Sequence, residues 1–362
     1  MSETMALGIL IRKFCPVCKK RLSTTAFNNS KGTVDNLSGT CRACTNSRRR
    51  QHENLGKIRR RSADNLASAL RQGHIKIIRK LLNNGAKPHW SWVCETMREG
   101  HLAFAEELLE SGIDRNVFTM AAMGDSDGVT HRIRRVPMDA RLATSMEPNG
   151  HNVTPLHVGC ASNWRSHGQN HMTAQVEVAK ALRKHGADVN AHARYRGIDD
   201  ATPLFCACWS SGNAILVQWL LDQGANATDR DLLAALGHFQ RHNKGEYEIA
   251  DALLAWGLSV DGNFPGNRTP LQAFAHQAAH KTVAWLIAHG AEVNARGPGD
   301  RTAAHFAAER NTGPTTLALL VESGADLAAR DEDGQTPLDI ARLNGKIRLI
   351  EWIERKIYAN DQ

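Results

Sequence analysis

Four cysteines near the start of the chain have the spacing of metal ligands. Cys15 and Cys18 form one Cys-x-x-Cys pair, and Cys41 and Cys44 form a second pair after 22 intervening residues. Each pair can present two thiolates to one ion, and two pairs complete the tetrahedral four-sulfur shell of a structural zinc site. Thiolates also favour zinc over harder cations. The pattern therefore predicts one structural Zn²⁺, and its closed shell leaves no position for a substrate.

The residues around these cysteines predict a small module that depends on the metal. About 35 residues bury too little apolar surface to be stable alone, so zinc would supply much of the folding free energy. The segment resembles a zinc ribbon of bacterial and phage proteins that often precedes HNH or recombination-endonuclease-VII-type nucleases. The resemblance rests on Cys15-Pro-Val-Cys18, Leu22, Phe27, Asp35-Asn36-Leu37 and Cys41-Arg-Ala-Cys44. It implies a nucleic-acid context, although Asn36 stands where those relatives usually have Gly.

A dense run of basic residues follows the second cysteine pair. Residues 1–61 hold fourteen Lys and Arg residues against three acidic residues, so this segment carries a net charge of +11, and the rest of the chain carries −3. Arg forms paired hydrogen bonds with phosphate, which favours sequence-independent contact with DNA or RNA. A solvated charged linker is the alternative interpretation. The candidate nucleic-acid contacts are Arg48, Arg49, Arg50, Lys57, Arg59, Arg60 and Arg61.

Beyond residue 61 an internal repeat organises the chain. A Thr-Pro-Leu-x tetrapeptide, or a variant of it, predicts a helix start, because Thr caps backbone N–H groups and Pro is tolerated in the first turn. A glycine mark predicts the end of a second helix. The tetrapeptides begin at Thr154, Thr202, Thr269, Thr302 and Thr336; the glycines are Gly186, Gly224, Gly257, Gly290 and Gly324, spaced by 38, 33, 33 and 34 residues.

Helix, turn, helix and short loop at this period resemble ankyrin repeats. The resemblance implies a mostly α-helical solenoid of about nine units that share one continuous core, preceded by the small zinc ribbon. The predicted organisation is a four-cysteine zinc ribbon at 1–50, a basic linker at 51–61, degenerate ankyrin-like repeats at 62–148, and ankyrin repeats with a polar C-terminal cap at 149–362.

Several reactive side chains in the repeats have structural explanations. Cys160 and Cys208 occupy a small-residue position of successive inner helices and are expected to be buried thiols. His157 and His305 lie in the tetrapeptide and are expected to hydrogen-bond the neighbouring loop.

Residues that the repeat does not require are candidates for partner binding. The segments 164–174, 192–200 and 239–246 are insertions, which usually form surface loops on the binding side of a repeat protein. In ankyrin arrays the hairpin tips and the inner-helix face bind partners. By this analogy, the predicted outward-facing contacts are Tyr195, Arg196, Trp209, His276, Arg301 and Arg310.

These patterns favour a non-catalytic adaptor that binds a protein partner through the solenoid. The basic zinc module would contact nucleic acid or the same complex. The alternative is a protein inhibitor or effector, encoded by a phage, without nucleic-acid binding. A nuclease is disfavoured because the repeats after residue 50 leave no room for an HNH ββα unit. No small-molecule substrate is expected.

The chain is expected to be cytoplasmic, in a bacterial or phage-infected cell. No stretch approaches 18 consecutive apolar residues, so no membrane span is predicted. The apolar run from Met5 to Ile11 has no basic residues before it, which is atypical of a secretory signal.

Overall fold

The structure is a computed structural model of the 362-residue chain. It describes four short strands between residues 12 and 41 at the level of the backbone, and residues 75–83, 89–146, 150–164, 167–242 and 247–360. The chain divides into two units, Met1–Ala86 and Lys87–Gln362. Among the described residues, no helix is both long and apolar enough to cross a bilayer.

The described residues of the first unit form two antiparallel hairpins and one helix. Strand β1 (Arg12–Cys15) pairs with β2 (Lys20–Ser23), and β3 (Phe27–Asn29) pairs with β4 (Leu37–Cys41). Each predicted Cys-x-x-Cys pair thus begins at the last residue of a strand, Cys15 on β1 and Cys41 on β4, and these two strands lie beside each other. Helix α2 (Ile75–Asn83) follows. Cys18, Cys44 and the basic run at 48–61 lie outside the described residues, so the zinc and nucleic-acid sites stay predictions.

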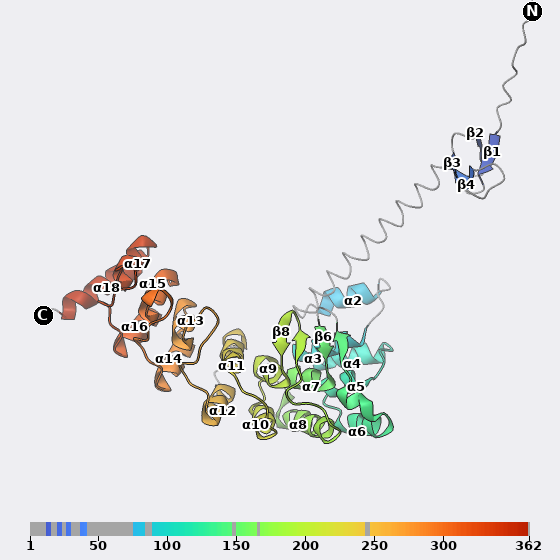
Figure 1. Cartoon of the computed structure of the whole chain (residues 1–362), viewed down its shortest axis with the longest axis horizontal. Coiled ribbons are helices and arrows are strands. Elements are labelled where there is room, and N and C mark those ends of the chain that lie inside the picture. Colours follow the sequence, from blue (N-terminus) through green and yellow to red (C-terminus); the bar gives the residue numbers. More distant parts are fainter. Residues whose placement is uncertain are drawn as a thin grey trace, which may run out of the picture. The chain divides into compact units, whose positions relative to one another are not determined.

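The second unit is a stack of helix pairs, in which the first helices lie along one side and the second helices along the other (Figure 1). Contacts between α5, α7 and α9, and between α6, α8 and α10, join successive pairs. The pairs are α3 (Trp90–Arg98) with α4 (Leu102–Glu110), α5 (Val117–Ala122) with α6 (Ser126–Arg135), α7 (Pro155–Ala161) with α8 (Gln169–Lys184), α9 (Pro203–Cys206) with α10 (Ala214–Asp222), α11 (Asp229–His242) with α12 (Glu248–Trp256), α13 (Pro270–His276) with α14 (His280–Ala288), α15 (Ala303–Arg310) with α16 (Thr315–Glu322), and α17 (Pro337–Leu343) with α18 (Ile347–Asn360).

The tetrapeptides start the inner helices, as predicted. Thr154 precedes α7, Thr269 precedes α13, Thr302 precedes α15 and Thr336 precedes α17. At Thr154, Thr269 and Thr336 the Thr hydroxyl accepts a hydrogen bond from the backbone N–H three residues later. In all four repeats the side chain at that later position accepts one from the Thr N–H. This reciprocal capping box satisfies donors that a helix start otherwise leaves unpaired.

Two repeated contacts join one repeat to the next. The Asn190 amide donates to the Gly224 carbonyl at 2.9 Å, and its oxygen accepts from the Asn226 N–H. Asn294 makes the equivalent pair with Gly324 and Asp326. The Asn that ends the Gly-Ala-x-Val-Asn mark therefore binds the glycine mark of the following repeat.

A four-stranded antiparallel sheet covers one stretch of the loop side. Its order is β5 (Thr144–Met146), β6 (Gly150–Val153), β7 (Ala193–Tyr195) and β8 (Ile198–Ala201). The hairpin β7–β8 occupies the predicted insertion 192–200.

Two other predicted insertions are loops only in part where the structure describes them, since Trp164, His167 and Gly168 lie in the turn between α7 and α8. Residues 169–174 lengthen α8 to 16 residues, compared with 9 in α10, and residues 239–242 are the last turn of α11. At residues 169–174 and 239–242 the expectation of a loop was wrong, because polar helix-compatible sequence extends the neighbouring helix.

The structural explanations given to the thiols and histidines are confirmed. Cys160 and Cys208 are buried, and burial raises their pKa. The His157 ring contacts the Ala201 carbonyl at 3.1 Å, and the His305 ring contacts the Gln335 carbonyl at 3.1 Å, both in the following loop.

Candidate partner-binding surface

The hairpin β7–β8 has a tight two-residue turn that fixes the position of one predicted contact residue. Tyr195 pairs with Ile198, which leaves Arg196 and Gly197 as the turn. Both have positive φ, 54° and 81°. A turn of this kind matches the twist of the flanking strands, but it is uncommon for an Arg. The chain thus holds Arg196 in a restricted backbone geometry at the hairpin tip.

The inner helix beside this hairpin departs from its neighbours at two positions. Phe205 stands where His157, Gln272, His305 and Asp339 stand in the other capped repeats, so it cannot complete a capping box. After α9 the chain continues as a π-helical segment, η4 (Ala207–Ser211). The Phe205 and Trp209 rings stack with centroids 5.6 Å apart. Single π turns are rare in proteins, and those that occur often lie at functional sites.

The hairpin and η4 together enclose a pocket of about 180 Å³, which we name the hairpin pocket. Three of the six predicted partner contacts line it: Tyr195, Arg196 and Trp209. The full lining is Tyr195, Arg196, Ile198, Phe205, Cys206, Trp209 and Ser210.

One expectation about this group was wrong. Tyr195 was predicted to face outward, but it is only 5% exposed. The cause is the hairpin register: Ala193 and Tyr195 both face inward and Arg194 faces solvent, since side chains alternate along a strand. Burial, and then the charge of Glu95, raise the pKa of the Tyr195 phenol.

A buried ion-pair cluster lies below the hairpin tip. The Glu95 carboxylate of α3 is fully buried and lies 3.1 Å from Arg196 Nε and 3.4 Å from Arg98 Nε. Arg98 also pairs with Glu99. Two cations thus face two anions, and the cluster is electrically balanced. Removing one partner of such a cluster would leave an uncompensated buried charge.

A second, wider hollow lies on the other side of Phe205. It measures about 360 Å³ and is lined by residues of the hairpin base and of the following loop, including Asp200, Thr202 and Arg230. The Arg230 guanidinium lies 5.0 Å from the Phe205 ring centroid and donates to the Asp199 carbonyl at 2.6 Å. Phe205 is therefore a wall shared by two neighbouring hollows.

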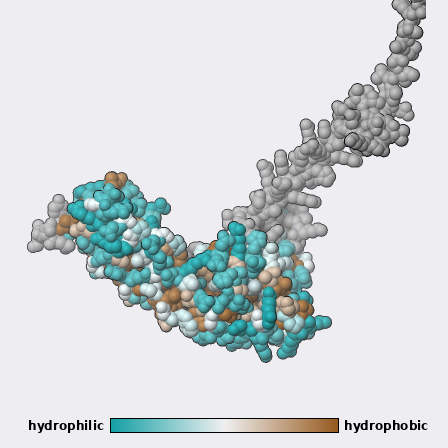
Figure 2. Space-filling model, in the orientation of Figure 1, coloured by the Kyte–Doolittle hydropathy of each residue, from teal (hydrophilic) through white to brown (hydrophobic). Residues whose placement is uncertain are grey.

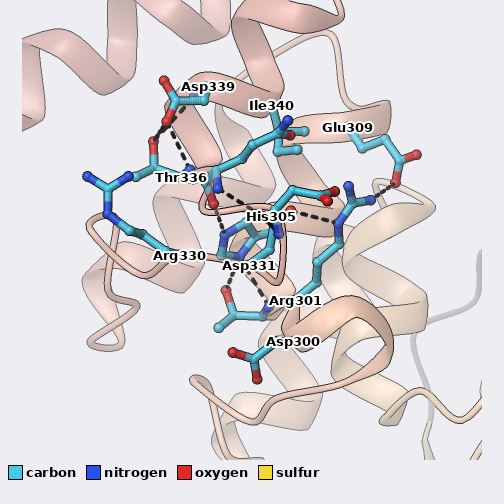
Figure 3. A network of polar contacts seen from close by, with 12 residues as sticks. Asp300, Arg301, His305, Glu309, Arg330, Asp331, Thr336, Asp339 and Ile340 are labelled. Carbon is cyan, nitrogen blue, oxygen red and sulfur yellow. Dashed lines mark hydrogen bonds and ion pairs between the residues drawn. The ribbon is translucent and has the colours of Figure 1, made fainter.

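Two more predicted contacts, Arg301 and His276, meet at Glu309 on the C-terminal repeats; Figure 3 shows the polar network around Arg301. Arg301 Nε donates to Asp331 at 3.1 Å, and Arg301 also lies 3.7 Å from Glu309. His276 reaches the same Glu309 carboxylate at 3.7 Å. These ion pairs join the repeat of Arg301 to its neighbours. Only part of the Arg301 side chain is exposed.

The electrostatics of this network favour a charged aspartate and a neutral histidine. Burial on its own would raise the pKa of Asp331, but hydrogen bonds from the Gln335 N–H and the Arg301 guanidinium outweigh it and lower the pKa. Burial, and then the charge of Arg268, lower the pKa of His276. Arg310, the sixth predicted contact, is exposed at the end of α15.

Sequence reasoning missed the residues that build these sites from the inside. Glu95 lies in the degenerate part of the chain, where no repeat mark identifies its position. Ser210 belongs to a π turn that no spacing rule foretells. Phe205 had a visible signal, because it replaces the polar fourth residue of the tetrapeptide. The face shown in Figure 2 is mostly hydrophilic, with scattered apolar side chains.

Comparison with known proteins identifies the repeat. A family model described as ankyrin repeats (3 copies) matches residues 232–331 and 278–361, and one described as ankyrin repeat matches residues 151–194 and 199–232.

Individual relatives resemble only part of the chain. Ankyrin repeat and SOCS box protein 5 of Mus musculus is 34% identical over 110 residues, which are 30% of this chain and 32% of that protein. Putative E3 ubiquitin-protein ligase XBAT35 of Arabidopsis thaliana is 39% identical over 122 residues, 33% of this chain and 26% of that protein. The chain therefore spans about a third or less of these relatives. The crystal structure of the human ASB11 ankyrin repeat domain aligns with 66% of this chain and 98% of its own, at 28% identity and a TM-score of 0.48.

Proposed function

Because residues 151–361 belong to the ankyrin-repeat family, we propose that this chain is a non-catalytic adaptor that binds a folded protein through its repeat unit. The observation that carries the proposal is the hairpin pocket. Arg196 and Trp209, two of the predicted partner contacts, line one recess together with Tyr195. Arg, Trp and Tyr are the residues that most often dominate binding energy in protein interfaces.

The proposed surface runs over the hairpin tips and the inner-helix face of residues 149–330. It includes the hairpin pocket at one end, and His276, Arg301 and Arg310 further along. A standard interface buries roughly 1,600 Å² in total, which a few neighbouring repeats can supply. The relatives named as SOCS box proteins and E3 ubiquitin ligases support a role in recruiting a partner into an assembly, and the partner's identity follows from the experiment below.

The N-terminal module gives this adaptor a second contact. We propose that Cys15, Cys18, Cys41 and Cys44 hold one structural Zn²⁺ and that the basic run from Arg48 to Arg61 contacts nucleic acid or the same complex. The +11 charge of residues 1–61 supports this. A protein inhibitor or effector without nucleic-acid binding is the competing function, and the −3 charge of the remaining chain is compatible with both.

A matched pair of tryptophan variants tests where the partner binds. Trp209 lines the hairpin pocket, and Trp256 is an equally large, exposed side chain at the end of the outer helix α12. The partner is first recovered with the tagged full-length chain, identified and purified, and its affinity is then measured for each variant.

We expect Trp209→Ala to weaken binding by about 2 kcal/mol, the size of an interface anchor, and Trp256→Ala to leave it unchanged. Thermal melting establishes that both variants are folded. Loss of the partner with Trp256→Ala and its retention with Trp209→Ala would place the site on the side of the outer helices and contradict the proposal.

A further inference from the structure

The walls of the hairpin pocket contain two buried hydroxyl groups that nothing in the described part of the chain satisfies. The Tyr195 phenol and the Ser210 hydroxyl have no hydrogen-bond partner among those residues, although the two side chains are only 5% and 4% exposed. Leaving a buried hydroxyl unpaired costs the free energy of removing that group from water, with no hydrogen bond to offset it. Native proteins rarely keep such groups without a reason, and a missing ligand is one of the few that apply.

The backbone around the pocket is also irregular at two places. Arg196 has a φ of 54° at the hairpin tip, and Trp209 and Ser210 lie in the π-helical segment η4. In the equivalent part of the stack, α13 and α15 are regular α-helices. The stack therefore does not require the π turn, and such departures gather at binding sites.

Size and wall chemistry restrict what the pocket can hold. Its volume of about 180 Å³ is close to that of an apolar cavity of about 150 Å³ that holds benzene. The Phe205 and Trp209 rings favour an aromatic guest, because offset and edge-on ring pairs attract each other. One six-membered ring fits this space, with two hydroxyl groups available for a polar substituent.

Charge restricts the guest further. Glu95 and Glu99 face Arg98 and Arg196, so the net charge of the cluster beside the pocket is zero, although Arg196 Nε and Glu95 Oε1 form no hydrogen bond within the described residues. An uncharged guest avoids the cost of desolvating a charge without a counterion. A phenol hydroxyl is uncharged at neutral pH and both donates and accepts a hydrogen bond, which is what two unpaired hydroxyls need.

We infer that the hairpin pocket binds a phenol ring, presented as a tyrosine side chain of the protein partner. This inference rests on the proposed function and names the partner group that enters this recess. The partner's tyrosine ring lies against Phe205 and Trp209, and its hydroxyl bonds with Tyr195 and Ser210.

The test uses para-cresol, the side chain of tyrosine, as a probe on the full-length chain. Toluene is the matched probe that lacks the hydroxyl. Binding is followed by the shift of the Trp209 indole resonance, which is assigned with Trp209→Phe. We expect para-cresol to bind at millimolar concentration and more tightly than toluene by about fivefold for each hydrogen bond gained. Tyr195→Phe and Ser210→Ala should each remove about that factor.

Two variants elsewhere control for the loss of a hydroxyl group. Tyr247→Phe and Ser111→Ala remove hydroxyls that already have partners, Thr282 and the Leu108 carbonyl, and should leave para-cresol binding unchanged. If para-cresol fails to shift the Trp209 resonance, or binds Tyr195→Phe and Ser210→Ala as it binds the unchanged chain, the inference is wrong. The probe needs no partner, so this failure is distinguishable from failure of the adaptor function.

Discussion

The fourth residue of each tetrapeptide determines how one repeat joins the next. His157 and His305 each cap their own helix and also reach a carbonyl in the following loop, and Gln272 does the same with Ala295. This part of the fold could be predicted from sequence, because a polar side chain three residues after the Thr is placed to hydrogen-bond the backbone at the helix start and the next loop. Phe205 cannot make these hydrogen bonds, and the hairpin pocket forms at its repeat.

His157 makes the stability of the repeat unit depend on pH. Burial lowers its pKa to about 4, compared with about 6.5 in the unfolded chain. The folded state therefore favours the neutral imidazole ring of His157. The contribution of His157 to the free energy of unfolding is complete above pH 6.5 and is lost as the pH falls toward 4. The loss amounts to about 3 kcal/mol.

We expect His157→Gln to remove much of this loss. Gln272 shows that Gln can make both contacts in this fold, and Gln does not titrate. Urea unfolding at pH 7.5 and at pH 5 should show a smaller difference for the variant than for the unchanged chain. His151→Gln, at an exposed position, is the control. Equal pH dependence in all three proteins would refute this explanation.

The thiols should separate into two chemical classes. Burial raises the pKa of Cys94, Cys160, Cys206 and Cys208, so the native repeat unit should resist alkylation by iodoacetamide. Cys15, Cys18, Cys41 and Cys44 should be protected by zinc and should react once a chelator removes it.

Metal analysis checks the same prediction directly. We expect one zinc per chain, and Cys41→Ser should lose it while the helical circular-dichroism signal of the repeat unit stays. Full zinc occupancy after replacement of all four cysteines would contradict the assignment.

At the scale of elements, sequence predicted the inner helices but not the loop side. Helix starts follow from Thr and Pro, which act locally. The length of α8, the end of α11 and the sheet β5–β8 depend on which neighbouring segment a polar stretch joins, and spacing alone does not decide that. For the same reason the orientation of Tyr195 was missed, because it depends on the register of one hairpin.

The asparagine bridges between loops should contribute to cohesion of the stack. Asn294→Ala removes the hydrogen bonds to Gly324 and Asp326, and we expect it to lower the unfolding free energy by about 1–2 kcal/mol. Amide exchange should rise at residues 324–326. Asn344→Ala removes an amide that donates to the Ile340 carbonyl of the adjoining helix, and it should not affect those amides. Unchanged exchange at 324–326 in Asn294→Ala would mean that the bridge is dispensable.

At the scale of the whole molecule, charge is divided between the two ends of the chain. The first 61 residues carry +11 and the remainder −3, a division typical of proteins with a basic arm that contacts nucleic acid. The basic run and the four cysteines before it are predicted from the sequence alone.

We expect weak, sequence-independent DNA binding that falls with salt, with a log–log slope of about −0.9 per phosphate neutralised. Replacing Arg48, Arg49, Arg50, Arg59, Arg60 and Arg61 with Ala should remove most of it. Replacing the exposed Arg134, Arg135 and Arg310 of the repeat unit should not. Fluorescence anisotropy at several salt concentrations gives both results. If no binding is seen at low salt, the basic run is a linker.

The central claim is that the hairpin tips and inner-helix face bind a protein partner. Amide hydrogen exchange of the full-length chain, measured with and without the purified partner, tests it most directly. We predict added protection at β7–β8, at η4 and at residues 301–310, with the outer helices α10, α14 and α16 unchanged. Protection confined to those outer helices, or to the first 61 residues, would contradict the claim.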